Sequence, residues 1–255
     1  SLLSLMRIHA NADLTQNRLD WIPEDAEVAE EGDTVLFTGC APYFDAFFSH
    51  MKVKTLDATK GALTLMNAMG IKPVVMPDEV CCGHDLLWSG DRENFERLAK
   101  KNLENLKARG VKRVVFPCAE CYRTVAKDWA EIAGGLDFET VHIAELVAQS
   151  NLKLNGPAVN ATIQDPCRLS RHMEKADALR GAIAKSDSVK VTEMRRSGIS
   201  VQCCGSSSWV NCTSGTAALQ QDRLAEAKGT GADVLLTACP KCEIHLSCSQ
   251  FGKDD

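Results

Sequence analysis

Cysteine is the residue type whose number and spacing point most directly to chemistry in this 255-residue chain. Ten of its twelve cysteines fall into two sets with the same order: a single cysteine, a Cys-Cys-Gly sequence and a Cys-x-x-Cys sequence. Clustered thiols in a chain without an export signal are metal ligands or redox groups more often than disulfides. We call the two sets the first quintet (Cys40, Cys81, Cys82, Cys118, Cys121) and the second quintet (Cys167, Cys203, Cys204, Cys239, Cys242).

The matched spacing of the two quintets indicates an internal duplication. Equivalent cysteines, such as Cys40 and Cys167 or Cys118 and Cys239, are separated by nearly the same number of residues. Chance readily produces one Cys-x-x-Cys sequence but hardly two matched sets of five, and a repeat of this length indicates two similar units. We therefore expect an N-terminal segment with an acidic linker over residues 1–33, followed by two cysteine-rich domains over residues 34–153 and 154–255.

Short apolar runs lead towards most of the cysteine groups and are typical of buried strands. They lie at Thr34–Thr38, Arg113–Phe116, Ala161–Gln164, Ile199–Val201 and Asp233–Thr237. Helical periodicity separates them over Leu56–Met69, Asp91–Ala108 and Ala217–Lys228, each followed closely by a glycine.

Strands that alternate with helices predict an α/β fold with a parallel sheet in each half. The expected fold is two pseudo-symmetric Rossmann-like halves. Ligands of such sheets bind at the carboxyl ends of the strands, which is where the cysteine groups fall. The fold thus predicts that each quintet converges on one site.

The residues around the cysteines suit the presentation of thiolates. Gly83 and Gly205 follow the paired cysteines, where adjacent ligands need a tight backbone path that glycine tolerates best. Each Cys-x-x-Cys sequence is placed where a loop turns into a helix, so that free backbone N–H groups and the helix dipole stabilise negative charge. Asp165-Pro166 is expected to set the turn that presents Cys167.

Several kinds of site could use these thiols. A structural zinc site needs four ligands, fewer than each quintet offers, and a thioredoxin-like dithiol relay would use only the Cys-x-x-Cys pair. Buried structural cysteines, or one cluster paired with one zinc, are further alternatives. Iron–sulfur clusters account best for the pattern, because several thiolates hold each cluster and nearby N–H groups tune it.

The repeated arrangement from Cys40 to Cys121 and from Cys167 to Cys242 resembles the cysteine-rich CCG domain family, over roughly residues 34–248. That family includes the B-type and D-type catalytic subunits of heterodisulfide reductase, and related subunits of glycolate, lactate and glycerol-3-phosphate oxidation systems. The resemblance to the heterodisulfide reductase branch implies two noncubane [4Fe-4S] clusters, one held by each quintet. It also implies that a disulfide is cleaved between them, with one sulfur taken up at each cluster.

The sequence departs from the family's pattern after the second Cys-Cys-Gly. Gly205 is followed by Ser206-Ser207-Ser208-Trp209 instead of a glycine-rich stretch. Trp88 and Trp209 could narrow a substrate channel near the two sites. The identity of the disulfide therefore stays open.

Histidines and basic residues near the quintets are candidates for catalysis and binding. His84 and His172 could each supply a proton to a departing thiolate, because histidine titrates near neutrality, or could only orient a loop. Arg168, Arg171 and Lys241 border the second quintet, where they could bind an anionic substrate group or be ordinary solvated charges.

Composition narrows the function classes. The chain has 29 basic and 34 acidic residues and no basic stripe, which argues against nucleic acid as a partner. The longest apolar stretches, such as Ala62–Met69, are far shorter than a bilayer span, so no direct membrane span is expected. We expect a cytoplasmic protein, with docking at the periphery of a membrane complex left open. The chain begins with Ser1, which leaves open that it is a piece of a longer protein.

The expected function is that of an iron–sulfur catalytic subunit that reduces or forms a small disulfide. Electrons would come from an iron–sulfur or flavin partner subunit of a larger complex, because the chain has no G-x-G-x-x-G or Walker sequence of its own. The alternative is a non-catalytic electron-transfer module that relays electrons to a quinone or to another subunit. Cys212 and Cys248 have no counterpart in the first half and are expected to be packing residues.

Overall fold

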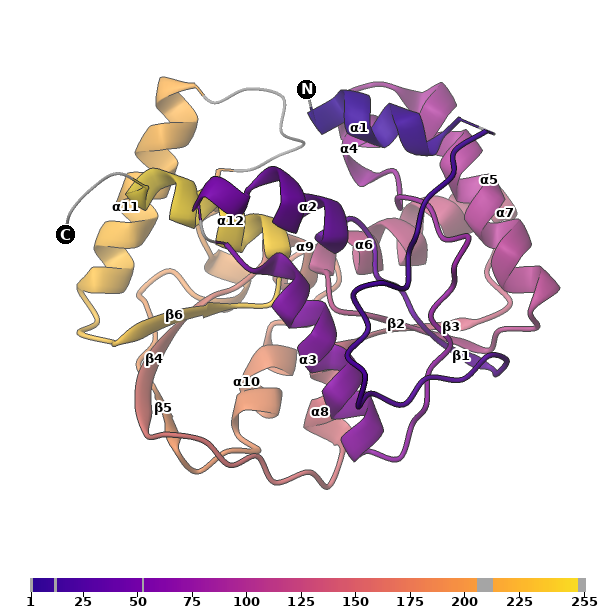
Figure 1. The fold of residues 1–255 in the computed structure, drawn as a ribbon. Coiled ribbons are helices and arrows are strands. Elements are labelled where there is room, and N and C mark those ends of the chain that lie inside the picture. The colour runs from indigo at the N-terminus through magenta and orange to yellow at the C-terminus, as the bar shows by residue number, and fades with distance from the viewer. Residues whose placement is uncertain (1, 12, 52, 206–212, 252–255) are drawn as a thin grey trace.

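Two three-stranded parallel sheets organise the chain in the computed structural model, which describes residues 2–11, 13–51, 53–205 and 213–251 (Figure 1). The first sheet has the order β1-β2-β3, with strands Thr34–Leu36, Arg113–Phe116 and Glu139–His142. The second has the order β5-β4-β6, in which β4 is Val159–Gln164, β5 is Val189–Val191 and β6 is Val234–Thr237. The expected α/β class with parallel sheets is confirmed.

Four of the five predicted strands are confirmed as β1, β2, β4 and β6. The prediction of a strand at Ile199–Val201 is wrong, because Gly198–Ser200 forms a 3-10 turn and β5 pairs with β4 instead. Gly198 has a left-handed φ of 57°, and the Ile199 side chain is 68% exposed, which is too open for a core strand. The short and partly polar β3 was not predicted.

Eight α-helices and two short segments of other helix types accompany the first sheet in the described part of the chain. All three helices expected from periodicity are confirmed, as α3 (Thr55–Ala68), α5 (Arg92–Ala108) and α11 (Ser214–Lys228). In the first half the α-helices are α1 (Leu2–His9), α2 (Ala41–Phe47), α3 (Thr55–Ala68), α4 (His84–Trp88), α5 (Arg92–Ala108), α6 (Ala119–Arg123), α7 (Ala130–Ala133) and α8 (Ile143–Gln149). The two other segments are a 3-10 turn at Ser49–Met51 and a π-helical segment at Thr124–Trp129, which joins α6 to α7.

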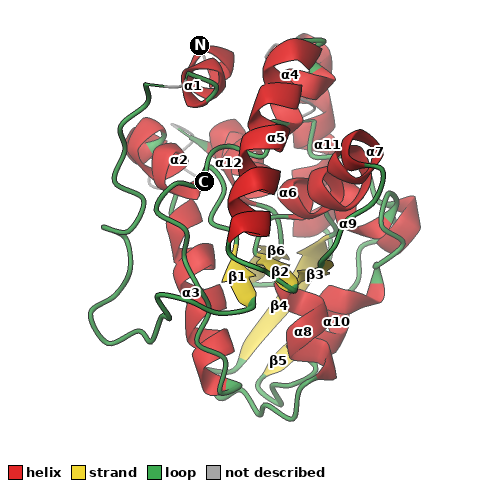
Figure 2. Ribbon diagram, turned by 90° about the vertical axis from the view of Figure 1, so that its right-hand side faces the viewer, coloured by secondary structure: helices red, strands yellow, loops and turns green. Residues whose placement is uncertain are grey.

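The helices of the second half are α9 (Cys167–Ser170), α10 (Asp177–Ile183), α11 (Ser214–Lys228) and α12 (Pro240–Gln250). Helices lie on both sides of the strands: α4, α5, α6 and α12 on one side, α8 and α10 on the other (Figure 2). The central strand β2 is accordingly buried on both faces, as in other covered parallel sheets: its neighbouring residues Val114 and Val115, which face opposite sides, are completely buried.

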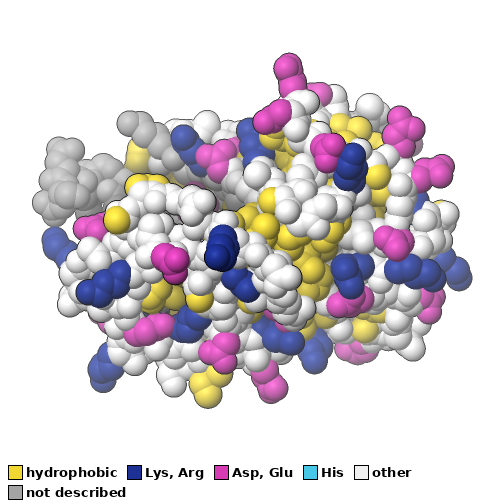
Figure 3. Space-filling model, turned by 90° about the horizontal axis from the view of Figure 1, so that it is seen from below, with side chains coloured by type: hydrophobic (Ala, Val, Ile, Leu, Met, Phe, Trp, Pro, Cys, Tyr) yellow, Lys and Arg dark blue, Asp and Glu magenta, His cyan; other side chains and the backbone are white. Residues whose placement is uncertain are grey.

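One continuous hydrophobic core runs through both halves. Residues of β1, β2 and α5 belong to the same buried cluster as Leu169, Ile244 and Leu246 of the second half. On the underside, hydrophobic side chains gather near the middle of the face (Figure 3), where α8 and α10 border an apolar groove of about 460 Å³. In the described residues no helix is long and apolar enough to cross a bilayer.

His142 ends β3 and caps α8, and it predicts an acid sensitivity of the fold. Its Nδ1 accepts a hydrogen bond from the Ala144 N–H at 3.2 Å, and burial lowers its pKa from 6.5 to about 4. The unfolded chain therefore binds a proton that the folded chain does not, so this contribution to stability is complete above pH 6.5 and is lost as pH falls towards 4. We expect a loss of about 2 kcal/mol between pH 7 and pH 5, measured by urea unfolding. The His142→Asn variant keeps a capping oxygen and should lack this part of the pH dependence; an unchanged pH dependence would contradict the assignment.

Candidate metal centre

The first quintet lines a single small cavity, of about 20 Å³. Its thiols come from the ends of three segments: the loop after β1, the loop before α4, and the start of α6, where Cys118 is the N-cap. The Cys40 and Cys81 sulfurs are 3.1 Å apart, and those of Cys121 and Cys82 are 3.4 Å apart. The structure therefore brings these five predicted residues together.

The second quintet lines a second cavity, of about 390 Å³. Cys167 is the first residue of α9, and Cys239 is the N-cap of α12, the position that Cys118 has in the first half. The thiol of Cys167 interacts with that of Cys203, and the thiol of Cys204 with that of Cys242. The second set of predicted residues also converges on one place.

The two quintets meet at Cys118 and Cys239. Their thiols interact across the boundary between the halves, and this interaction is the main reason why the pKa of Cys239 is raised to about 11. Within the first quintet, hydrogen bonds from neighbouring thiols lower the pKa of Cys81 and Cys118 well below its usual range, while the donating Cys40 has its pKa raised. The ten sulfurs thus form two adjoining groups.

The donor set of these groups fits iron–sulfur clusters. Every described cysteine is a free thiol, and sulfur separations of 3.1 and 3.4 Å are far longer than a disulfide bond of about 2.05 Å. Five converging thiols exceed the four ligands of a closed zinc site, and soft thiolates that share a buried pocket are the ligands that clusters use. The cysteines of the first quintet could hold one cluster and those of the second quintet another.

Glycine is required directly after each Cys-Cys pair, as the sequence predicted. Gly83 has a φ of +81° and Gly205 a φ of +86°, which side chains rarely adopt. A Cβ on Gly83 would lie 2.7 Å from the Phe95 ring, and one on Gly205 would lie 3.0 Å from the Thr216 carbonyl oxygen. Each pair of adjacent thiols therefore depends on its glycine for its backbone path.

Four buried charged or polar side chains connect the two cavities. His84 donates through Nδ1 to Asp85 at 2.8 Å, and the Lys241 ammonium pairs with Asp85 and, at 2.6 Å, with Glu120. Burial alone would raise the pKa of Asp85, but Lys241 and His84 lower it to about 2. Although His84, Asp85 and Glu120 lie close enough to suggest a cation site, Lys241 already supplies the positive charge there.

Trp88 and three basic residues border the second cavity. The Arg168 guanidinium lies 3.7 Å above the Trp88 ring, and its Nε donates to His84 Nε2 at 3.2 Å. His172 is exposed, and partial burial of its ring together with the charge of Arg168 lowers its pKa to about 4. Arg171, the third basic residue, donates to the Val201 carbonyl at 2.9 Å. Of the two predicted catalytic histidines, only His84 is buried between the cavities.

Other predictions have mixed outcomes. The prediction that Cys248 is a packing residue is wrong, since Cys248 is exposed on α12. Cys212, together with the Ser206–Trp209 stretch that departs from the family pattern, lies outside the described residues.

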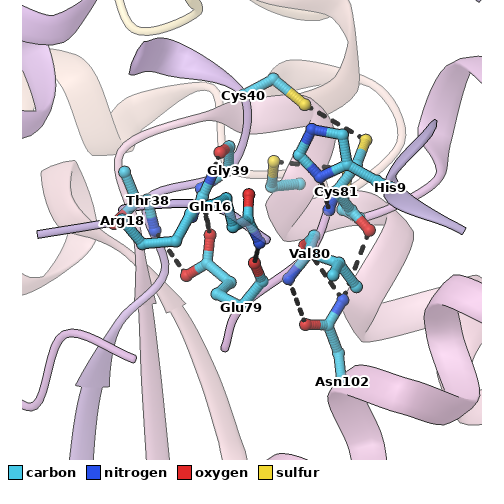
Figure 4. A network of polar contacts seen from close by, with 12 residues as sticks. His9, Gln16, Arg18, Thr38, Gly39, Cys40, Glu79, Val80, Cys81 and Asn102 are labelled. Atoms are coloured by element: carbon cyan, nitrogen blue, oxygen red, sulfur yellow. Dashed lines mark hydrogen bonds and ion pairs between the residues drawn. The ribbon is translucent and has the colours of Figure 1, made fainter. Parts of the chain in front are cut away.

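Sequence reasoning missed the residues that hold the first quintet's loops. Glu79 accepts hydrogen bonds from the backbone of Thr38 and Gly39, and Arg18 bonds to both Glu79 and Gly39 (Figure 4). Asp85 and Glu120 were also missed. The one available signal was the position of these three acids, each within three residues of a quintet cysteine.

An α/β protein with two adjoining sets of five free, converging thiols belongs to the class of cysteine-rich metal-centre proteins. More specifically, the chain belongs to the cysteine-rich CCG domain family, whose model matches residues 34–126 and 161–247. This confirms the resemblance seen in the sequence.

Curated relatives agree with that membership. The chain is 33% identical to a subunit of the dihydromethanophenazine:CoB–CoM heterodisulfide reductase of Methanosarcina barkeri, over 91% of this chain and 58% of that protein. It is 25% identical to a subunit of the fumarate reductase (CoM/CoB) of Methanothermobacter marburgensis, over 84% of this chain and 41% of the relative. A third relative is the EtfAB:quinone oxidoreductase of Syntrophomonas wolfei, at 27% identity over 72% of this chain and 25% of that protein. The chain thus spans little more than half the length of the first of these relatives.

Proposed function

We propose that this chain is an iron–sulfur catalytic subunit that reduces or forms a disulfide between two noncubane [4Fe-4S] clusters. The observation that carries the proposal is that two cavities, each lined by one complete quintet, adjoin at Glu120, which lines both. Membership of the CCG family and similarity to a heterodisulfide reductase subunit support it.

The ten cysteines are the proposed ligands, five to each cluster. When bound, the clusters supply single electrons and iron sites that can accept sulfur. The reduction consumes two electrons and two protons, breaks one S–S bond and yields two thiols. The chain's own contribution is to hold the two sets of thiolates side by side, so that one substrate can reach both.

The buried charges between the cavities suit the handling of these protons. His84 is the proposed donor, since it lies between the two quintets and contacts Asp85 and Arg168. A pKa of about 4 leaves His172 neutral at pH 7, so we assign it a role in lining the substrate cavity instead.

Domain organisation and partners follow from the same proposal. Residues 34–153 and 154–255 would be pseudo-symmetric Rossmann-like domains. In the first, Val74, which precedes the Cys-Cys pair, bridges to β1, the strand before Cys40. In the second, β5, which precedes the other Cys-Cys pair, adjoins β4, the strand before Cys167. Electrons would come from an iron–sulfur or flavin subunit in the cytoplasm, within a complex that can be peripheral to a membrane.

The proposal is tested by anaerobic assay of the iron-loaded chain with an artificial electron donor and a panel of small disulfides. We expect consumption of a disulfide and a thiol-dependent change in the electron paramagnetic resonance (EPR) spectrum. A loaded chain that accepts electrons but consumes no disulfide and shows no response to thiols would favour the alternative, a relay to a quinone or another subunit.

Replacement of the proposed proton donor gives a sharper test. We expect His84→Gln to lower disulfide turnover about 100-fold, the usual contribution of general acid catalysis, without changing the iron content. His50→Gln, at an exposed histidine, is the matched control and should leave turnover unchanged. Full activity of His84→Gln would remove His84 from the mechanism.

A further inference from the structure

The first cavity contains side chains from outside the two family matches. Met6 of α1, which is 1% exposed, lines the cavity together with the first quintet. His9 and Arg18, also nearly fully buried, contact the loops that carry Cys40 and Cys81. All three precede residue 34, where the first match begins.

We propose that residues 2–11 and 13–22 are an integral part of the first cluster site, in which Arg18 and His9 are positioning residues for Cys40 and Cys81. The inference rests on the proposed function, because it takes the first quintet to hold a cluster. The sequence alone suggested only a preceding segment and linker here.

Glu79 joins the two ligand loops directly. It lies two residues before Cys81, and its carboxylate accepts the N–H groups of Thr38 at 2.9 Å and Gly39 at 2.7 Å, just before Cys40. The separation of the two loops is thereby fixed by one side chain. Figure 4 shows this carboxylate between the two loops.

Arg18 stabilises this arrangement in a buried place. One of its terminal nitrogens contacts Glu79 at 2.5 Å and donates to the Gly39 carbonyl at 2.7 Å, and both charged side chains are almost completely buried. Gln16 adds a hydrogen bond to the Glu79 carbonyl at 2.7 Å. A buried carboxylate without its cation is strongly destabilised, so the Glu79 contact depends on Arg18.

His9 holds the other loop from the same segment. Its Nδ1 accepts the Cys81 N–H at 3.2 Å, and its ring packs edge-on against Tyr43 with centroids 4.6 Å apart. On the opposite side, Asn102 of α5 bonds to the Val80 and Cys81 carbonyls. The Cys81 backbone is therefore fixed between α5 and the N-terminal segment.

The second half makes the equivalent connections from within its own family match. Gln164 donates to the Gln202 carbonyl at 3.3 Å, which joins the strand before Cys167 to the residue before Cys203. Asp165 accepts the Gly198 N–H at 2.6 Å and pairs with Arg180. Arg180 is thus the second-half counterpart of Arg18.

The test uses two full-length variants as backgrounds, each expected to hold one cluster. The first background, Cys204→Ala, should keep only the cluster of the first quintet, and the second background, Cys82→Ala, only that of the second quintet. With Arg18→Gln added, we expect iron release to a ferrous chelator to become about tenfold faster in the first background, because the charge-assisted hydrogen bonds to Glu79 and Gly39 are lost, and to stay within about twofold in the second. The EPR spectrum should change only in the first. Arg180→Gln should give the reverse pattern.

Conservative variants separate positioning from a general loss of folding. His9→Gln keeps an acceptor for the Cys81 N–H and should release iron at nearly the parent rate, whereas His9→Leu should resemble Arg18→Gln. Equal effects of Arg18→Gln in both backgrounds, or none in either, would overturn the inference while leaving the proposed function intact. If neither background binds iron before Arg18 is changed, the proposed function itself fails.

Discussion

Replacing Cys82 by Ala is expected to lower the iron content of the anaerobically loaded protein from about eight to about four atoms per chain. Cys82 lies at the middle of the first quintet, between Cys81 and Cys121, so its loss interrupts the group of thiols. The second quintet lines a different cavity and should keep its cluster. Cys204→Ala should have the mirror effect.

Iron, sulfide and zinc assays together with EPR spectra distinguish the outcomes. Cys248→Ala is the matched control, because Cys248 is an exposed free thiol outside both quintets, and it should keep all the iron. Near-stoichiometric zinc with little iron in the parent protein would remove the cluster assignment. Retention of both clusters in either variant would remove Cys82 or Cys204 from the set of ligands.

The parts of the fold that could be predicted are those with a local signal. The buried runs that become β1 and β2 are continuously apolar, and Asp91 and Gly110 mark the two ends of α5. The cysteine spacing added a long-range signal, because it required distant strand ends to share one edge. The wrong prediction of a strand at Ile199–Val201 also came from a local signal, because two β-branched residues suggest a strand. In the fold, Gly198 turns the chain and leaves Ile199 exposed.

The supporting residues of the site could not be predicted, because their partners are remote and leave no periodic trace. Arg18 meets Glu79 across 61 residues, and Lys241 meets Asp85 across 156. A lone arginine or lysine in a sequence is most often solvated, and only the folded chain shows that these two are buried. Lys241 was named from its place in a Cys-x-x-Cys sequence, but its acidic partners were not.

These buried ion pairs stabilise the site in two different ways. The Arg18–Glu79 pair acts within the first half, where it fixes the loops of Cys40 and Cys81. Lys241 acts between the halves, because it projects from the second Cys-x-x-Cys sequence to acids beside the first quintet. The relative position of the two quintets should therefore depend on Lys241 more than on any surface contact.

Replacing Lys241 by Met is accordingly expected to destabilise the protein by about 3–5 kcal/mol, because it leaves Asp85 and Glu120 buried without their cation. The loss corresponds to a fall in melting temperature of about 10 °C or more for a chain of this size. Lys175→Met, which removes a half-exposed pair with Glu145, is the control and should cost at most about 1 kcal/mol.

A triple variant distinguishes the ion pairs from simple packing at this position. Adding Asp85→Asn and Glu120→Gln to Lys241→Met removes the stranded charges, so most of the melting temperature should return. Because the ammonium is then still missing between the cavities, the EPR response to added thiol should stay altered even though stability is restored. If Lys241→Met alone melts within a few degrees of the parent protein, Lys241 does not hold the two halves together through its charge.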